Sequence, residues 1–226
     1  MEKLPGEKVR EFVCDAVLLD MDGTLVDSTD VVIRQWRCWA DRHGLPLDRI
    51  LANSHGRLTL DTMRIVAPHL ASAEEAEAFE RSEVQDADGI KAVKGASVFL
   101  GDLKDDQWAV VTSASRELAR VRLPAAGLPI PKVLVSADDV RAGKPDPEGY
   151  LTAAKLLGAV PKRCLVVEDS VAEIQAARRA GMSVLGITTT LPSEQLDADA
   201  CISDFSEIRV DKADIHGGIR ILVASA

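Results

Sequence analysis

The stretch VLLDMDGTLVDS, residues 17–28, decides the fold of this chain. Its aliphatic start, together with Ala16, predicts a short buried strand over residues 16–19, because brief aliphatic runs that end at a turn signal are typical of central sheet strands. Side chains alternate along an extended backbone, so Asp20 and Asp22 are expected to project to the same side where this strand ends. Gly23 permits a sharp turn and exposes backbone N–H groups. This pattern suits a site for a divalent metal and a phosphoryl group, and the alternative is a solvated acidic turn.

Three later segments also place polar side chains at strand ends or turns. They are WAVVTS (residues 108–113), GKPDP (residues 143–147) and LVVEDS (residues 165–170). The first and third are apolar strands that end in hydroxyls and in two adjacent acids, and the second is a turn that holds a lysine. With the Asp20–Asp22 pair they make up the four-part signature of the haloacid dehalogenase superfamily. The chain closely resembles the phosphatase branch of that superfamily over roughly residues 12–223.

Composition indicates an ordinary globular protein. The chain has 226 residues, of which 46% are hydrophobic and 28% charged, and its net charge of −9 argues against a nucleic-acid surface. No apolar window is long enough to span a membrane, and the first residues lack the apolar stretch of a signal peptide. We therefore expect a soluble cytoplasmic protein, monomeric or a small homo-oligomer, whose partner is a small phosphorylated metabolite and neither nucleic acid nor a membrane.

The chain divides into a helical block and an alternating block. From Thr29 to about Val93 only helices are expected, including one capped by Ser28 and others over residues 59–70 and 73–84. From Gly95 onward strands and helices alternate, which predicts an α/β fold with a parallel, Rossmann-like sheet. Strands are expected over residues 108–112, 132–136, 164–167 and 183–187, helices over 115–126, 147–157 and 171–180, and a closing hairpin over 207–210 and 219–223.

The family resemblance implies how these blocks are joined. Members insert a helical cap between their first and second motifs, so residues 1–28 and 94–226 are expected to form the catalytic core and residues 29–93 an all-helical cap. The expected hinges are residues 27–30 and 93–95. At the second hinge this chain has Lys94 before Gly95, where relatives usually have proline.

Hydrolysis of a phosphate ester needs a nucleophile and a proton donor for the leaving group. Asp20 is the candidate nucleophile, because a carboxylate can form an acyl phosphate and divide one difficult displacement into two easier steps. Asp22 is the candidate general acid and base. Thr24 either holds Asp22 in place or makes a local turn hydrogen bond.

Clustered carboxylates repel one another, and a hard divalent cation such as Mg²⁺ relieves this repulsion. The resemblance implies that its ligands are the Asp20 carboxylate, the Asp22 backbone carbonyl and Asp169, with Glu168 bound directly or through water. The two adjacent acids also suit the start of the helix over residues 171–180, where negative charge is favourable. Both interpretations can hold together, with Ser170 as the cap of that helix.

Three further residues are expected to contact the phosphoryl group. The Ser113 hydroxyl and the Ala114 amide can hold phosphoryl oxygens at a helix N-terminus, although Ser113 could instead cap that helix. Lys144 lies on a stiff turn, because Pro145 disfavours helical geometry before it. The resemblance implies that this lysine neutralises the nucleophile and the phosphate.

The cap is expected to select the substrate. Its loop SHGRLTLD, residues 54–61, offers His55, Gly56 and Arg57 as substrate-binding residues, and helix capping or salt bridging is the alternative. The stretch from this loop to Pro68, together with residues 136–145, resembles the branch that acts on glycerol phosphate and 2-deoxyglucose phosphate. This resemblance implies a Mg²⁺-dependent phosphatase of small phosphorylated sugars or polyols.

Other functions remain possible at this point. A phosphomutase would share all four motifs, with Lys91 or Lys94 available to hold a bisphosphate. A dehalogenase would not require the acid Asp22, and a phospho-accepting signalling receiver would lack the helical insertion. A silent binding module would not require every catalytic group to be intact.

Overall fold

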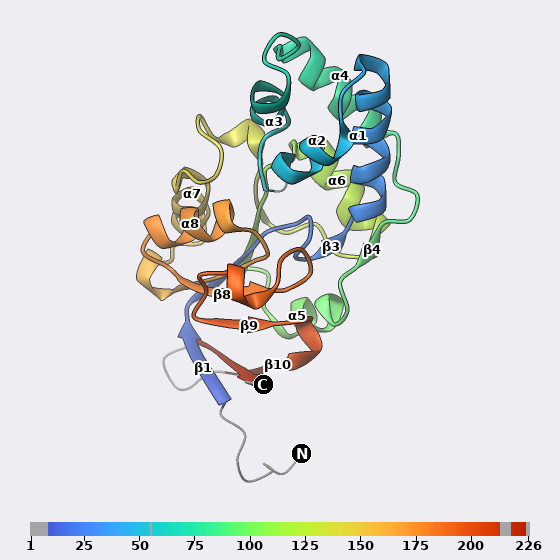
Figure 1. The fold of residues 1–226 in the computed structure, drawn as a ribbon. Coiled ribbons are helices and arrows are strands. Elements are labelled where there is room, and N and C mark those ends of the chain that lie inside the picture. Colours follow the sequence, from blue (N-terminus) through green and yellow to red (C-terminus); the bar gives the residue numbers. More distant parts are fainter. Residues whose placement is uncertain (1–8, 55, 213–217, 225–226) are drawn as a thin grey trace.

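The computed structural model describes residues 9–54, 56–212 and 218–224. Its centre is a six-stranded parallel sheet in the order β6-β5-β2-β7-β8-β9 (Figure 1). The strands are β2 (Ala16–Leu19), β5 (Trp108–Val111), β6 (Val133–Val135), β7 (Cys164–Glu168), β8 (Ser183–Ile187) and β9 (Ala200–Ile202). Leu19 is in register with Val110 and Val167, so the strands that precede three of the sequence motifs end at the same edge of the sheet.

Successive residues of each strand point to opposite faces of this sheet, and both faces are buried. Ala16 and Leu18 pack with the buried side chains of α7 (Glu148–Leu156) and α8 (Val171–Arg179). Val17 and Leu19 pack with those of α5 (Ala96–Asp102) and α6 (Arg116–Ala125). The expected α/β core is therefore confirmed. Short 3-10 turns complete the connections: η1 (Ala137–Asp139), η2 (Pro161–Arg163), η3 (Ser193–Gln195) and η4 (Phe205–Glu207).

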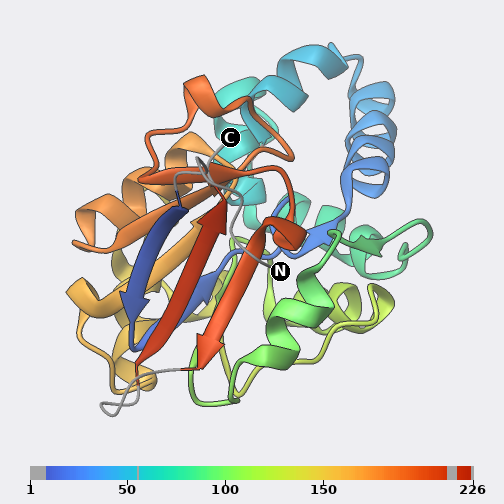
Figure 2. The ribbon, with the colours of Figure 1, turned by 90° about the horizontal axis from the view of Figure 1, so that it is seen from below.

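A second, antiparallel sheet of order β1-β11-β10 lies against the core (Figure 2). Its strands are β1 (Val9–Cys14), β10 (Ile208–Lys212) and β11 (Ile219–Ala224). The pairing of β10 with β11 confirms the expected closing hairpin. Strand β1 pairs with β11 along its whole length.

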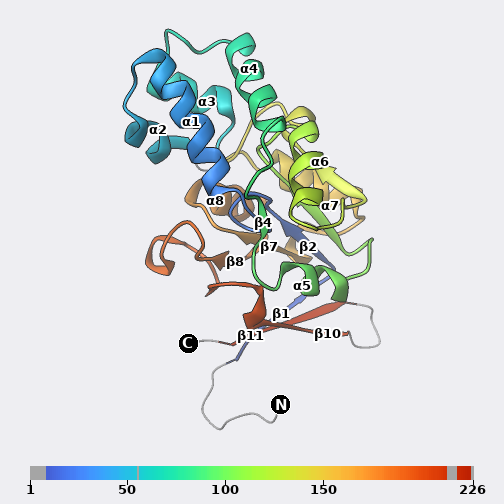
Figure 3. The same ribbon diagram turned by 90° about the vertical axis from the view of Figure 1, so that its right-hand side faces the viewer.

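Four helices form a separate layer above the carboxyl edge of the parallel sheet (Figure 3). This helical layer consists of α1 (Thr29–His43), α2 (Leu47–Ser54), α3 (Thr59–Val66) and α4 (Ala73–Val84). It has a hydrophobic cluster of its own, in which the Trp36 and Phe79 ring centroids are 4.1 Å apart. No helix among the described residues is long and apolar enough to cross a membrane.

The expectation that the chain from Thr29 to about Val93 forms helices alone is wrong for the last residues of this segment. Lys91–Ala92 forms strand β4, which pairs antiparallel with β3 (Val26–Asp27) where the chain crosses between the sheet and the helical layer. Helix α3 ends at Val66 and not near residue 70, because Pro68 disfavours helical geometry at Ala67. Helices α2 and α5 were not among the expected elements.

Candidate active site

Asp20 lies at the end of β2, where its side chain meets Lys144. The residue is 3% exposed, and Lys144 Nζ donates a hydrogen bond to its Oδ1 over 2.7 Å. The same ammonium group donates to Glu168 Oε1 at 2.9 Å, to Glu173 Oε1 at 2.6 Å and to the Val111 carbonyl at 3.0 Å. The structure thus places the sequence-predicted Asp20 and Lys144 in direct contact.

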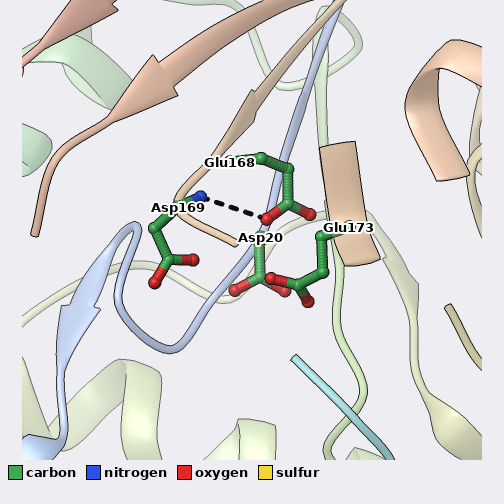
Figure 4. A group of neighbouring side chains, drawn as sticks. All are labelled: Asp20, Glu168, Asp169 and Glu173. Atoms are coloured by element: carbon green, nitrogen blue, oxygen red, sulfur yellow. Dashed lines mark hydrogen bonds between the residues drawn. The ribbon is translucent and has the colours of Figure 1, made fainter. Parts of the chain in front are cut away.

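Four buried carboxylates lie close together, and Lys144 contacts three of them; Figure 4 shows the four carboxylates. They are Asp20, Glu168, Asp169 and Glu173, and one oxygen of each lies within 4.8 Å of the others. Burial and the Glu173 charge raise the pKa of Asp169 to about 7, and burial likewise raises the pKa of Asp20 and of Glu168. One ammonium group does not offset this charge. An all-oxygen donor set of this kind fits Mg²⁺.

Glu173 is a member of this cluster that sequence reasoning missed. It belongs to the first turn of α8 and is 2% exposed, and the Ser170 hydroxyl donates to its Oε2 at 2.9 Å. Ser170 stands at the N-cap position of α8, but its side chain caps no backbone N–H, so the expected capping bond is wrong. The sequence did carry a signal for the burial of Glu173, because this residue lies on the same helix face as Ala177, four residues later, which is buried.

The turn after β2 approaches the cluster closely at Gly23. Its φ of 84° lies in the left-handed region, and a Cβ there would stand 2.1 Å from Asp169 Oδ2. The Thr24 hydroxyl makes neither of the expected hydrogen bonds, to Asp22 or within the turn. It donates instead to Asp169 Oδ1 at 3.4 Å. Asp169 also accepts a hydrogen bond from the Thr190 hydroxyl. The turn is therefore built against the second acidic motif.

Asp22 lies beside this cluster, with its carboxylate held by two other residues. Its Oδ1 accepts from the Ser28 hydroxyl at 2.6 Å, and its Oδ2 pairs with Arg122 Nη1 at 2.7 Å. Ser28 stands at the N-cap position of α1 but makes no side-chain capping bond, so the expected cap is wrong. Arg122 was not among the sequence-predicted residues, and its Nη2 also pairs with Glu83 Oε1 at 2.7 Å.

Ser113 and Ala114 follow β5 at the edge of the same cleft. The Ser113 hydroxyl donates to the Gly56 carbonyl at 3.2 Å, and the Ala114 N–H donates to Thr112 Oγ1 at 3.1 Å. The N-cap of α6 is Ser115, so the capping alternative for Ser113 is wrong.

The loop before α3 brings the helical layer onto the core. A Cβ at Gly56 would lie 2.5 Å from Ser170 Oγ and 2.9 Å from Glu173 Cδ, so only glycine fits this contact. Arg57 is exposed and lines the cleft, and no ion pair joins it to any other residue within the described ranges. His55, the other sequence-predicted residue of this loop, lies outside the described residues.

The resulting cleft lies between the helical layer and the sheet. Asp20, Asp22 and Ser113 line it from the core side. From the helical layer come aromatic and charged side chains: Trp36, Arg57, Phe79, Glu80 and Glu83. The cleft therefore presents Asp20 and Glu173 of the acidic cluster to any molecule held beneath the helical layer.

Comparisons with known proteins agree with this geometry. The family model of haloacid dehalogenase-like hydrolases matches residues 14–181. Hexitol phosphatase A of Escherichia coli is 38% identical over 205 residues, covering 88% of this chain and 95% of its own. Validoxylamine A 7'-phosphate phosphatase of Streptomyces hygroscopicus is 38% identical over 204 residues, covering 85% and 94%.

A solved structure supports the same assignment. A hydrolase from Pseudomonas syringae superposes with a TM-score of 0.75 at 29% identity, covering 85% of this chain and 94% of its own. The four sequence motifs, their convergence at one edge of the sheet and these similarities agree, and the chain belongs to the haloacid dehalogenase-like hydrolase family as an enzyme of its phosphatase branch.

Proposed function

We propose that this enzyme hydrolyses phosphate monoesters of small sugars or polyols with Mg²⁺, through an aspartyl phosphate formed on Asp20. The observation that carries the proposal is the buried Asp20 carboxylate, 2.7 Å from Lys144 Nζ, at the end of the central strand. The names of the two 38% identical relatives, which act on hexitol and validoxylamine phosphates, support the substrate class.

The reaction takes two steps. In the first, an oxygen of Asp20 attacks phosphorus and the bond to the ester oxygen breaks, while Asp22 gives that oxygen a proton. In the second, Asp22 takes a proton from water, which attacks the acyl phosphate and restores the Asp20 carboxylate. Lys144 offsets the negative charge of the nucleophile and of the phosphoryl oxygens, and the Ser113 hydroxyl, which here donates to the Gly56 carbonyl, would turn to donate to one of those oxygens.

We assign the metal site to Asp20, Glu168 and Asp169, with the backbone carbonyl of Asp22. When bound there, Mg²⁺ neutralises charge on the phosphoryl oxygens. Glu173 adds a fourth carboxylate, and its hydrogen bonds to Lys144 and Ser170 suit it to orient the lysine rather than to replace a ligand.

We divide the chain into a catalytic core of residues 1–28 and 94–226 and a cap of residues 29–93. The separate hydrophobic cluster of the helical layer supports this division, and so does the crossing of the chain at β3 and β4. Residues of the cap would then recognise the leaving group, while the core holds the phosphoryl group. Gly56 and Arg57 of the cap line the cleft, and Gly56 packs against Ser170 and Glu173 of the core.

The lining of the cleft favours a neutral leaving group rich in hydroxyls. The Glu80 carboxylate of α4 lines the cleft, where it would repel a second phosphate or a carboxylate, whereas the charge of Glu83 is paired with Arg122. The Trp36 and Phe79 rings supply apolar surface for the C–H groups of a sugar or polyol. The names of the two 38% identical relatives, both phosphatases, do not favour the phosphomutase alternative, which requires a bisphosphate.

Phosphate release over a panel of esters tests the proposal. The panel contains hexitol phosphates, glycerol phosphate, 2-deoxyglucose 6-phosphate, both glucose phosphates and phosphoglycolate, each measured with Mg²⁺ and with a chelator. We expect Mg²⁺-dependent release from the sugar and polyol esters and little from phosphoglycolate, whose leaving group is anionic. Interconversion of the two glucose phosphates without net phosphate release would instead identify a phosphomutase.

A further inference from the structure

Arg122 joins three parts of the molecule that are far apart in the sequence. It lies on α6 and is 3% exposed. Its Nη1 is 2.7 Å from Asp22 Oδ2 in the turn after β2, and its Nη2 is 2.7 Å from Glu83 Oε1 on α4 of the helical layer. Glu83 is 5% exposed, so this second ion pair is buried on both sides.

The geometry of a guanidinium group makes this a rigid connection. Its donors lie in one plane at fixed angles, so placing one carboxylate limits where the other can be. The Ser28 hydroxyl holds the other oxygen of Asp22 at 2.6 Å, and the two donors together fix the plane of that carboxylate. The Arg122 Nε atom is buried without a hydrogen-bond partner, so the arginine is held in place by these two ion pairs.

We propose that Arg122 is a positioning residue for proton transfer, which holds the Asp22 carboxylate toward the leaving group when α4 supplies Glu83 as the second anchor. The inference rests on the proposed role of Asp22 as general acid and base. A proton is transferred only within hydrogen-bond reach, so a carboxylate free to rotate away from the ester oxygen loses efficiency. Arg122 affects the reaction by orienting Asp22, and Glu83 affects it by anchoring Arg122.

The test compares two leaving groups. The variants Arg122→Gln and Arg122→Lys are assayed with the best polyol phosphate and with p-nitrophenyl phosphate, whose leaving group needs little protonation. We expect Arg122→Gln to lower kcat for the polyol phosphate about tenfold or more, with a much smaller loss for the aryl ester. Arg122→Lys should recover part of kcat, because it keeps the charge and one hydrogen bond. An equal loss on both substrates would mean a purely structural role and would overturn the proposal.

A double-mutant cycle with Asp22→Asn separates this inference from the proposed function. If Arg122 acts through Asp22, adding Arg122→Gln to Asp22→Asn should lower kcat for the polyol phosphate little further. Full additivity contradicts the inference. If Asp22→Asn itself has no effect that depends on the leaving group, the proposed function fails at its acid, whatever Arg122 does.

Three further variants control for folding and for charge. Arg122→Gln leaves Glu83 buried without its cation, so the double variant Arg122→Gln/Glu83→Gln is measured beside it, with Tm as the check on the fold. Glu83→Gln alone should reproduce the dependence on the leaving group in weaker form, and wild-type behaviour would overturn the coupling to α4. The matched control is Arg116→Gln on the same helix, which removes the partly exposed ion pair to Asp139 and should leave kcat within about twofold.

Discussion

Gly23 lies so close to Asp169 that any side chain at position 23 would collide with the carboxylate. A Cβ on Gly23 would stand 2.1 Å from Asp169 Oδ2, and the φ of 84° disfavours any residue but glycine. The turn of the first acidic motif and Asp169 of the second therefore pack closely because position 23 has no side chain.

Gly23→Ala should abolish turnover, because the methyl group displaces Asp169 and with it the metal site. The matched control is Gly44→Ala, at a φ of 65° with no atom within 4 Å of the added carbon. Both variants should lose roughly 1 kcal/mol of stability from the backbone conformation. Only Gly23→Ala should also lose activity, as measured by phosphate release, and equal activity of the two variants would contradict the close packing.

Asp20→Asn should abolish phosphate release while the protein stays folded, since a carboxamide has nearly the same shape but does not attack phosphorus. The measurement is turnover of the best ester from the panel, with Tm and circular dichroism as controls. Activity within about tenfold of wild type would place the nucleophile elsewhere.

Asp22→Asn should slow turnover most for poor leaving groups. A sugar or polyol alkoxide needs a proton as it leaves, whereas an activated aryl oxide is already a weak base. The experiment compares kcat for one polyol phosphate and for p-nitrophenyl phosphate. The same loss on both would argue against proton donation by Asp22.

Arg57→Ala and His55→Ala should change the ranking of substrates more than the chemical step. Loss of one charged hydrogen bond to the substrate costs about 1.5–3 kcal/mol, or roughly one to two decades in kcat/KM. The exposed Arg81 of α4, which pairs with Glu77, is the matched control, and Arg81→Ala should leave the ranking unchanged. If both loop variants lose aryl phosphatase activity as completely as Asp20→Asn, these residues belong to the catalytic machinery or to the fold. If neither changes the ranking, other residues of the cap, such as Arg64 or Lys91, become the next candidates.

Mg²⁺ should raise the Tm of the wild-type protein, because it relieves repulsion within the buried acidic cluster. A ligand at a hundred times its Kd stabilises the folded state by about 2.7 kcal/mol. Asp169→Asn should reduce this shift, whereas Asp204→Asn, at an exposed ion pair with Lys94, should leave it unchanged. A shift that is the same in all three proteins would place the metal outside the cluster.

Much of this architecture could be predicted because local pattern and tertiary structure agree. The run over residues 183–187 is a buried strand by its composition, and β8 has those bounds. Strand β4 was missed because two residues, Lys91 and Ala92, carry no periodic signal, and only the partner strand makes them a strand. Helix α2 is short, and its eight residues bury only Ile50 completely, so its pattern is weak.

The candidate site could likewise be predicted only in part. Asp20 and Lys144 stand in motifs whose order along the chain carries information, so they could be found without coordinates. Arg122 is 100 residues from Asp22, and nothing around it in the sequence distinguishes it from the other arginines of α6. Its role depends on the helical layer resting on α6, which is a property of the assembled fold.

The pairing of β3 with β4 brings the two ends of the helical layer side by side. An insertion whose ends meet in this way can be exchanged at one narrow stem without changing the path of the sheet strands. The hydrophobic cluster inside the layer would travel with it, because it is separate from the clusters on the two faces of the sheet. The fold is therefore suited to modular engineering, in which one core accepts helical layers from different relatives, and each exchanged layer must match the core at Arg122 and at the close contact made by Gly56.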